Sequence, residues 1–192
     1  GKGKQYNEKG DLIFEGNYIN GKRNGKGIEY NIESINIAHI FEGEYLNGIK
    51  NGFGKLYIND KLIFEGNYIN NKKNGYGKEY YSKNKILFQG KYLDDKKWEG
   101  KGYNPNGQLE YEINNGYGYI KEYKNILGSI IFEGEYLNGE KNGKGKEYEN
   151  GKLIFEGEYK NGKREGKGKE YNFKERSIEF EGEYKNGKRW NV

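Results

Sequence analysis

The feature that most constrains this chain is a phrase that recurs along it about every 23 residues. The first half of the phrase reads Phe-Glu-Gly-x-Tyr, and the second half reads Gly-x-Gly-x-Glu-Tyr. A fixed period of this length is typical of repeat proteins, in which one small structural unit stacks on the next. The first half occurs at Phe14–Tyr18, Phe41–Tyr45, Phe64–Tyr68, Phe88–Tyr92 (with Gln89), Phe132–Tyr136, Phe155–Tyr159 and Phe180–Tyr184.

Each repeat is predicted to be a β-hairpin. Along residues 12–18, alternation with a period of two places Leu12, Phe14, Gly16 and Tyr18 on one face and the polar residues on the other. Asn-Gly pairs at 20–21 and 24–25 bracket the connection, and such pairs supply the positive φ that hairpin turns require. The strand over 25–30 returns with glycines, which we interpret as slots for aromatic rings.

Composition favours a thin core over a thick one. Apolar residues make up 32% of the 192 residues and charged residues 33%, while the chain contains 20 Tyr and 9 Phe. An isolated hairpin is marginally stable in water, so the hairpins are expected to stack. The predicted fold is all-β: an elongated, twisted, single-layer antiparallel sheet of stacked β-hairpins, on the order of 70 Å long.

The repeats predict one continuous array over residues 1–192, with about seven to eight hairpins and both ends cut within a repeat. Two stretches break the pattern, 31–40 and 98–118. The first is longer than usual and alternates apolar residues, which predicts an extended hairpin. The second is expected to bend the array or change its twist, with Pro105 outside the central hydrogen-bond ladder. Specificity for a partner is expected to reside in these irregular stretches.

The segment Phe155–Tyr171 resembles a MORN repeat, the membrane occupation and recognition nexus motif. The resemblance extends from Gly1 to Trp190 and is weakest in the repeat at Leu109–Gly118 and in the 31–40 insertion. It implies stacked hairpins with a groove lined by aromatic and glycine positions, acting as an accessory or scaffold part. It also implies dimerisation, docking of a partner helix, or binding of acidic phospholipids. The Lys-, Asn-, Ile- and Tyr-rich composition of the repeats resembles that of arrays from protists with AT-rich genomes.

The residues needed for catalysis or metal binding are missing from the sequence. The chain has no Cys and one His, which is His39, so we expect no metal site, no disulfide and no conventional catalytic triad. His39 is interpreted as a partly exposed strand residue. The glutamates at the second position of the phrase are interpreted as a solvated ladder paired with lysines. We therefore predict a chain that is not an enzyme, with no cofactor and no small-molecule substrate.

The leading functional hypothesis is a scaffold that binds a partner helix or peptide, or a second copy of itself, through an aromatic groove. A Tyr ladder is predicted to line that groove. Its alternative role is core packing between repeats, and both roles are compatible. The predicted groove residues are Tyr18, Tyr45, Tyr68, Tyr92, Tyr136, Tyr159 and Tyr184.

A second hypothesis is a membrane-surface tether that binds acidic phospholipids through basic turns. The candidate lipid-binding residues are Lys22, Arg23, Lys72, Lys73, Lys96, Lys97, Lys163 and Arg164. A third is the targeting arm of an enzyme whose catalytic domain lies outside this chain. Nucleic acid is not expected as a partner. No membrane-spanning run, signal peptide or lipidation signal is found in the sequence, which predicts a cytoplasmic protein at the cell cortex, the cytoskeleton or a membrane surface.

Overall fold

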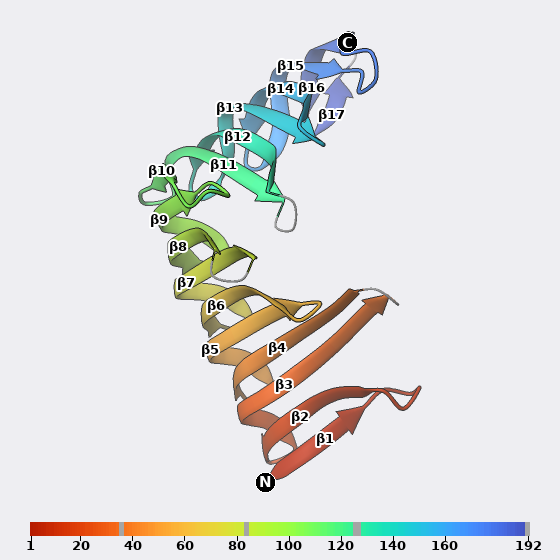
Figure 1. Ribbon diagram of the computed structural model, residues 1–192, viewed down its shortest axis with the longest axis vertical. Helices are drawn as coiled ribbons and strands as arrows, with labels where there is room; N and C mark the ends of the chain where they lie inside the picture. Colours follow the sequence, from red (N-terminus) through yellow and green to blue (C-terminus); the bar gives the residue numbers. More distant parts are fainter. Residues whose placement is uncertain (35–36, 83–84, 125–127, 191–192) are drawn as a thin grey trace. The chain divides into compact units, whose positions relative to one another are not determined.

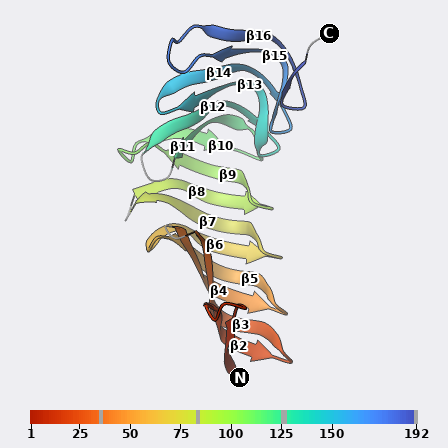
Figure 2. The same cartoon turned by 90° about the vertical axis from the view of Figure 1, so that its right-hand side faces the viewer.

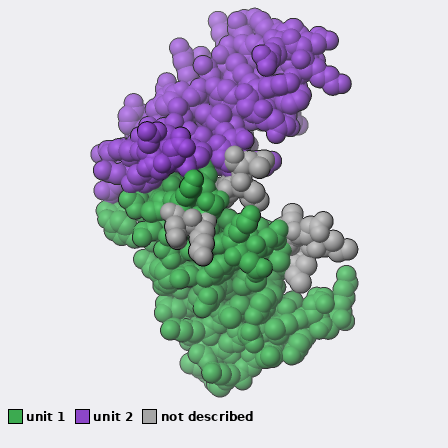
Figure 3. All heavy atoms as spheres, in the orientation of Figure 1, with its two compact units in different colours: residues 1–95 green, residues 96–192 purple. Residues whose placement is uncertain are grey.

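The structure, a computed structural model, describes residues 1–34, 37–82, 85–124 and 128–190. Seventeen β-strands and no helix occur among these residues, which confirms the all-β prediction. The chain forms two compact units, Gly1–Asp95 and Lys96–Val192, which Figure 3 shows in green and purple. That the whole chain is one continuous array stays a prediction.

In the first unit eight strands lie side by side in chain order, and each pairs antiparallel with the next (Figure 1). The order is linear and the sheet is not closed, so these strands form a single layer. The strands are β1 (Lys2–Tyr6), β2 (Leu12–Ile19), β3 (Lys22–Ser34), β4 (Ile37–Leu46), β5 (Ile49–Ile58), β6 (Lys61–Ile69), β7 (Lys72–Ser82) and β8 (Lys85–Leu93).

The second unit begins with the antiparallel pair β9 and β10 and continues with seven antiparallel strands in chain order (Figure 2). The predicted stack of hairpins is therefore present in both units. The strands are β9 (Lys96–Tyr103), β10 (Leu109–Ile113), β11 (Gly118–Lys124), β12 (Ser129–Leu137), β13 (Glu140–Glu149), β14 (Lys152–Lys160), β15 (Lys163–Tyr171), β16 (Ile178–Lys185) and β17 (Lys188–Trp190).

The described two-residue hairpin turns have positive φ at both residues, whereas longer loops join β1 to β2, β9 to β10 and β15 to β16. Between β2 and β3 these are Asn20 at 49° and Gly21 at 75°. Such a turn matches the right-handed twist of the flanking strands and favours Asn followed by Gly. Between β6 and β7 the second place is taken by Asn71, whose φ is 67°, so this turn also accepts asparagine.

The second Asn-Gly pair of the repeat forms a bulge and not a turn. Tyr18 pairs with Arg23 and Gly16 pairs with Gly27, so Asn17 alone faces residues 24–26 of β3. Gly25 within this bulge has a φ of 81°. The prediction that both Asn-Gly pairs bracket the connection was wrong at this point, because β3 already begins at Lys22. Two extra residues in β3 produce this geometry, and glycine accepts it without strain.

The first irregular stretch has the predicted extended hairpin. Strands β3 and β4 continue past the usual repeat as far as the pair Ser34 and Ile37. Residues 35 and 36 of this insertion lie outside the described residues. His39 lies in β4 between Asn31 and Ile58 and is partly exposed, as predicted.

The second irregular stretch interrupts the ladder. Pro105 lies in the loop between β9 and β10, which confirms that it is outside the strands. Strands β10 and β11 are joined by a turn at Asn115 and Gly116, and an isolated bridge between Asn114 and Tyr117 closes this turn. Strand pairing is therefore broken within 98–118, while the expected bend or change of twist there stays a prediction.

Candidate functional site

The sheet face that carries the phenylalanines is the core of each unit. Phe14 and Phe155 are fully buried, and each ring lies across glycines of its own hairpin. A Cβ added to Gly27 would lie 2.3 Å from Cζ of Phe14, so the ring occupies the space of a side chain. The interpretation of the glycines as ring slots is confirmed for the second glycine of Gly-x-Gly, such as Gly27. It was wrong for the first, because a Cβ on Gly25 would meet the side chain of Asn17 and not a ring. Glycines paired across neighbouring strands form a glycine ladder: Gly3, Gly16, Gly27, Gly43, Gly54, Gly66, Gly77 and Gly90 in the first unit, and Gly134, Gly145, Gly157, Gly168 and Gly182 in the second.

Tyrosine rings complete the core by joining one hairpin to the next. The ring of Tyr45 lies edge-on to Phe41 of its own hairpin, at 5.8 Å between centroids, and to Phe14 of the preceding one, at 5.1 Å. Tyr159 bridges Phe155 and Phe132 in the same way in the second unit. Such edge-to-face contacts add about 1 kcal/mol beyond burial of area. We call this zigzag of rings the aromatic column.

The seven tyrosines predicted to line a groove belong to this column. Six of them are between 3 and 7% exposed, and Tyr18 is partly exposed. A partner laid on this face would therefore meet very little tyrosine surface. Packing between repeats accounts for these residues, and their role in binding a partner stays a prediction.

Cations cover the aromatic column. The guanidinium carbon of Arg23 lies 4.1 Å from the ring centroid of Phe14, and Nζ of Lys141 lies 3.9 Å from that of Phe132. In both cases the cationic side chain belongs to the second residue after the hairpin turn. The attraction between a cation and the face of an aromatic ring favours its place over the phenylalanine. The same arrangement holds for Lys50 on Phe41, Lys73 on Phe64, Arg164 on Phe155 and Arg189 on Phe180.

A glutamate from the end of the phrase holds each of these cations. Glu29 pairs with Arg23 at 2.6 Å and with Lys50 at 2.8 Å, and it accepts a hydrogen bond from the hydroxyl of Tyr45. In the second unit Glu147 pairs with Arg164 at 2.5 Å and accepts the Tyr159 hydroxyl at 2.7 Å. Cation, carboxylate and hydroxyl thus form a repeating polar cap on the column. This cap was not predicted from the sequence, although a Lys or Arg recurs at the second place after the turns and indicates it.

The cap determines how these carboxyl groups titrate. Burial alone would raise the pKa of Glu147, but the hydrogen bonds from Arg164 and Tyr159 outweigh it and hold that pKa below its ordinary value. Burial alone would likewise raise the pKa of Glu29, but Lys50 and Arg23 hold that pKa below its ordinary value. Burial and the hydrogen bond to Glu170 raise the pKa of Tyr184 to about 12.

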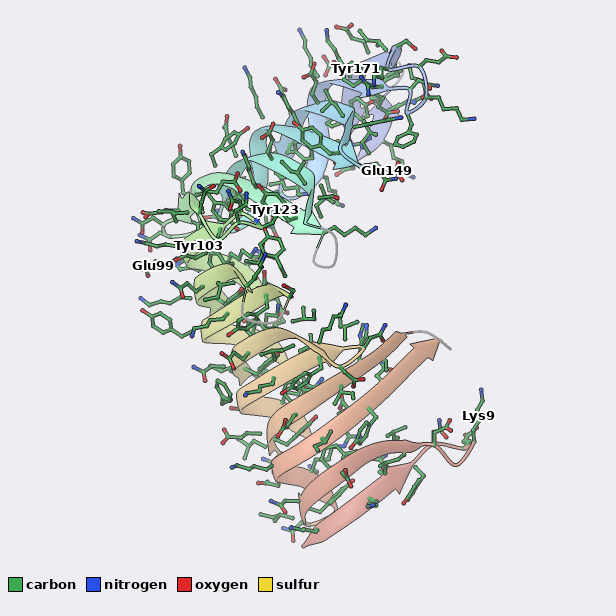
Figure 4. The ribbon with its side chains drawn as sticks, viewed as in Figure 1. Lys9, Glu99, Tyr103, Tyr123, Glu149 and Tyr171 are labelled. Atoms are coloured by element: carbon green, nitrogen blue, oxygen red, sulfur yellow. The ribbon has the colours of Figure 1, made fainter. Side chains whose placement is uncertain are left out.

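Acid is expected to destabilise the fold through these glutamates. Because their pKa is lower in the folded chain, their contribution is fully present above the unfolded value of about 4.3 and is lost as the pH falls through the folded values. Thermal unfolding followed by circular dichroism should show the melting temperature falling by several degrees between pH 5 and pH 3. Glu147→Gln should lower it at pH 7 and reduce this acid loss, whereas Glu149→Gln, at an exposed residue labelled in Figure 4, should do neither. An equal acid loss in both variants would contradict the cap's role.

Of the eight predicted lipid-binding residues, five contact polar side chains of the protein and three are exposed. Arg23, Lys73 and Arg164 belong to the polar cap, and their side chains are 19, 22 and 23% exposed. Lys97 lies 3.5 Å from the hydroxyl of Tyr111, which takes the place of Phe in its repeat, and Lys96 pairs with Glu140 at 2.8 Å. The exposed residues are Lys22, Lys72 and Lys163.

The opposite face of the sheet carries the predicted glutamate ladder. Glu15 pairs with Lys4 at 3.5 Å, and Glu181 pairs with Lys169 at 3.1 Å, as that interpretation requires. Tyrosine hydroxyls add contacts that the sequence did not indicate. The hydroxyl of Tyr171, labelled in Figure 4, donates to Glu156 at 2.6 Å. Tyr30, Tyr80 and Tyr148 donate likewise to Glu15, Glu65 and Glu133.

Two open grooves lie on this second face, above the backbone of the glycine ladder. In the first unit a groove of about 860 Å³ is lined by strands β1 to β5 and includes Ile28 and Phe53. In the second unit a groove of about 680 Å³ is lined by strands β11 and β13 to β16. Its side chains are Lys and Glu, with Tyr119 at one end. Neither lining includes any of the seven tyrosines predicted for a groove.

Metal-ligand clusters and membrane-spanning helices are absent from the described residues. No group of three or more His, Asp or Glu in them is placed to hold a metal ion. The part of the chain that the structure describes contains no helix that is long and apolar enough to cross a membrane.

The stacked hairpins, the glycine ladder and the aromatic column define a β-hairpin repeat protein. The family model of the MORN repeat matches residues 14–31, 41–61, 64–85, 132–152, 155–172 and 180–191. These segments cover more than half of the chain, which therefore belongs to the MORN repeat family, as its resemblance implied. A search of curated proteins found no match. MORN repeats suggest a repeat-based binding or scaffold module, and the family is generally non-catalytic.

Proposed function

We propose that this chain is a non-catalytic binding module that holds a segment of a protein partner on its grooved face. One observation carries the proposal: the two faces of the sheet are built differently. The phenylalanine face is closed by the chain's own cations and glutamates, whereas the opposite face has open grooves with exposed side chains. Concave surfaces of stacked repeats are common sites for extended partners.

The polar cap makes the membrane-tether hypothesis less favoured. Arg23, Lys73 and Arg164 already neutralise glutamates of the chain, so they have less charge to offer to lipid headgroups. A second copy of the chain is also a protein partner, and size-exclusion chromatography with light scattering distinguishes self-association from binding to another protein.

Selection of peptides from a random display library tests the proposal. Peptides that bind the intact chain should crosslink to a photoreactive residue placed at Lys55 or Lys146, which line the two grooves. The matched control is Lys9, an exposed residue at the tip of the turn between β1 and β2 (Figure 4). If no peptide is enriched, or if all of them crosslink from Lys9 and none from the grooves, the proposal fails.

A further inference from the structure

The grooved face of the first unit differs in chemistry from that of the second. Beside the glycine ladder, towards the hairpin turns, each sheet has a row of exposed side chains, which we call the turn-side row. It consists of cross-strand pairs formed by the middle residue of Gly-x-Gly and the fourth residue of Phe-Glu-Gly-x-Tyr. The pairs of the first unit are Lys2 with Asn17, Lys26 with Glu44, Phe53 with Asn67 and Tyr76 with Lys91. The pairs of the second unit are Lys101 with Glu112, Tyr119 with Glu135, Lys144 with Glu158 and Lys167 with Glu183. In the second of these Ile120 takes the place of the second glycine, so Tyr119 stands between Gly118 and Ile120.

The charges of the two rows have opposite balance. In the first unit three lysines stand against one glutamate, which gives a net charge of +2. In the second unit three lysines stand against four glutamates, which gives −1. The difference arises because Asn17, Asn67 and Lys91 take places that glutamate holds in every row pair of the second unit.

The free charge of the first row is positive. Lys2 and Lys26 have no ion pair and no side-chain hydrogen bond within the described part of the chain. The single carboxylate of the row, that of Glu44, accepts the backbone N–H of Phe53 at 3.0 Å and is thereby engaged in the bulge.

Two aromatic side chains of the first row stand at a place where the second row has lysine in three of its four pairs and Tyr119 in the other. Phe53 is 47% exposed and Tyr76 is 65% exposed, although burial would be favourable for both. They lie two strands apart, or about 10 Å, which is the distance between apolar residues seven apart on a helix or three apart on an extended chain. Exposed aromatic residues are enriched in protein interfaces, whereas lysines belong to the polar rim that surrounds the interface core.

We propose that the turn-side row of the first unit docks an acidic protein segment with apolar side chains. This inference rests on the proposed function and names the partner's chemistry. Carboxylates of the segment pair with Lys2 and Lys26, and its apolar side chains cover Phe53 and Tyr76. Glu15, Glu42 and Glu44 line the same groove. A nucleic acid would bring its regularly spaced phosphates against these three carboxylates, whereas a peptide can place its charges at the lysines alone.

Peptides enriched on the intact chain, measured by fluorescence anisotropy, test this partner chemistry. The enriched set should be rich in Asp and Glu with interspersed apolar residues. The double variant Phe53→Ser with Tyr76→Ser removes both exposed aromatic side chains without changing the charge of the row, and it should weaken binding about tenfold or more. Lys26→Glu should weaken it several-fold and reduce its salt dependence. Lys9→Glu, at an exposed residue outside both grooves, makes the same charge change and is the control that should leave binding unchanged.

Each other outcome is informative. Enriched peptides without acidic residues, or acidic peptides that bind the double variant as tightly as the wild type, would overturn this inference and leave the binding module standing. A complete lack of enriched peptides would remove the proposed function as well. Oligothymidine and phosphatidylserine vesicles serve as competing probes. If they bind the row in place of the acidic peptides, the row would be assigned to phosphate chemistry instead. Circular dichroism verifies that each variant is folded.

Discussion

Replacing Phe64 with alanine should lower the free energy of unfolding of the first unit by about 4 kcal/mol. The Phe64 ring is fully buried and makes edge-on contacts with Tyr68 at 5.6 Å and Tyr92 at 5.3 Å. It also lies 4.1 Å below the ammonium group of Lys73. Truncation would leave a cavity between two repeats and remove the surface on which the cation rests. Urea denaturation followed by circular dichroism measures the loss.

The exposed Phe53 provides a control of the same residue type. Because Phe53 is 47% exposed, Phe53→Ala should change stability by less than about 0.5 kcal/mol. It should nevertheless weaken binding of the acidic peptides. If both alanine variants lost the same stability, the division of this sheet into a packed face and a binding face would be wrong.

Replacing Gly54 with alanine should destabilise the first unit by about 3 kcal/mol, an unusually large effect for one methyl group. The new Cβ would lie 2.3 Å from Cζ and 2.5 Å from Cε2 of Phe41. The ring cannot withdraw easily, because Tyr45 and Tyr68 adjoin it and Lys50 lies over it. Urea denaturation again measures the change.

A turn glycine and a double variant separate a clash from a general intolerance of glycine replacement. Gly48 has a φ of 94° and no atom within 4 Å of its missing Cβ. Gly48→Asn should cost less than about 1 kcal/mol, since asparagine adopts this conformation. Combining Gly54→Ala with Phe41→Leu should cost clearly less than the sum of the two single changes. Strict additivity would show that the ring is not what excludes the methyl group.

Local pattern was sufficient to predict the hairpins. The alternation over Leu12–Tyr18 correctly identified the face that carries Phe14, and the Asn20-Gly21 turn was also correct. The Asn24-Gly25 pair was misread because turns and bulges both use positive φ and hence the same residues. The distinction depends on which residues pair across the strands, and that register is not local.

The basic residues of the turns show the limit of reading charge from sequence. Lys22 and Arg23 are neighbours with the same charge, and both were grouped as candidates for binding lipid. In the sheet they fall on opposite faces: Lys22 is exposed, while Arg23 lies over Phe14 beside Glu29. Alternation along the strand could have separated them, but the bulge that precedes Gly27 obscures the period.

The sequence by itself determined the all-β class, the hairpin unit, the ring slots in the glycines and the family, because each depends on residues close together in the chain or on their repetition. The tertiary structure decided which face is closed and which has open grooves. The tyrosines predicted to line a groove are buried against the preceding hairpin and capped by the cation that follows its turn. That coverage comes from residues more than 20 positions away, so it exists only once the repeats have stacked.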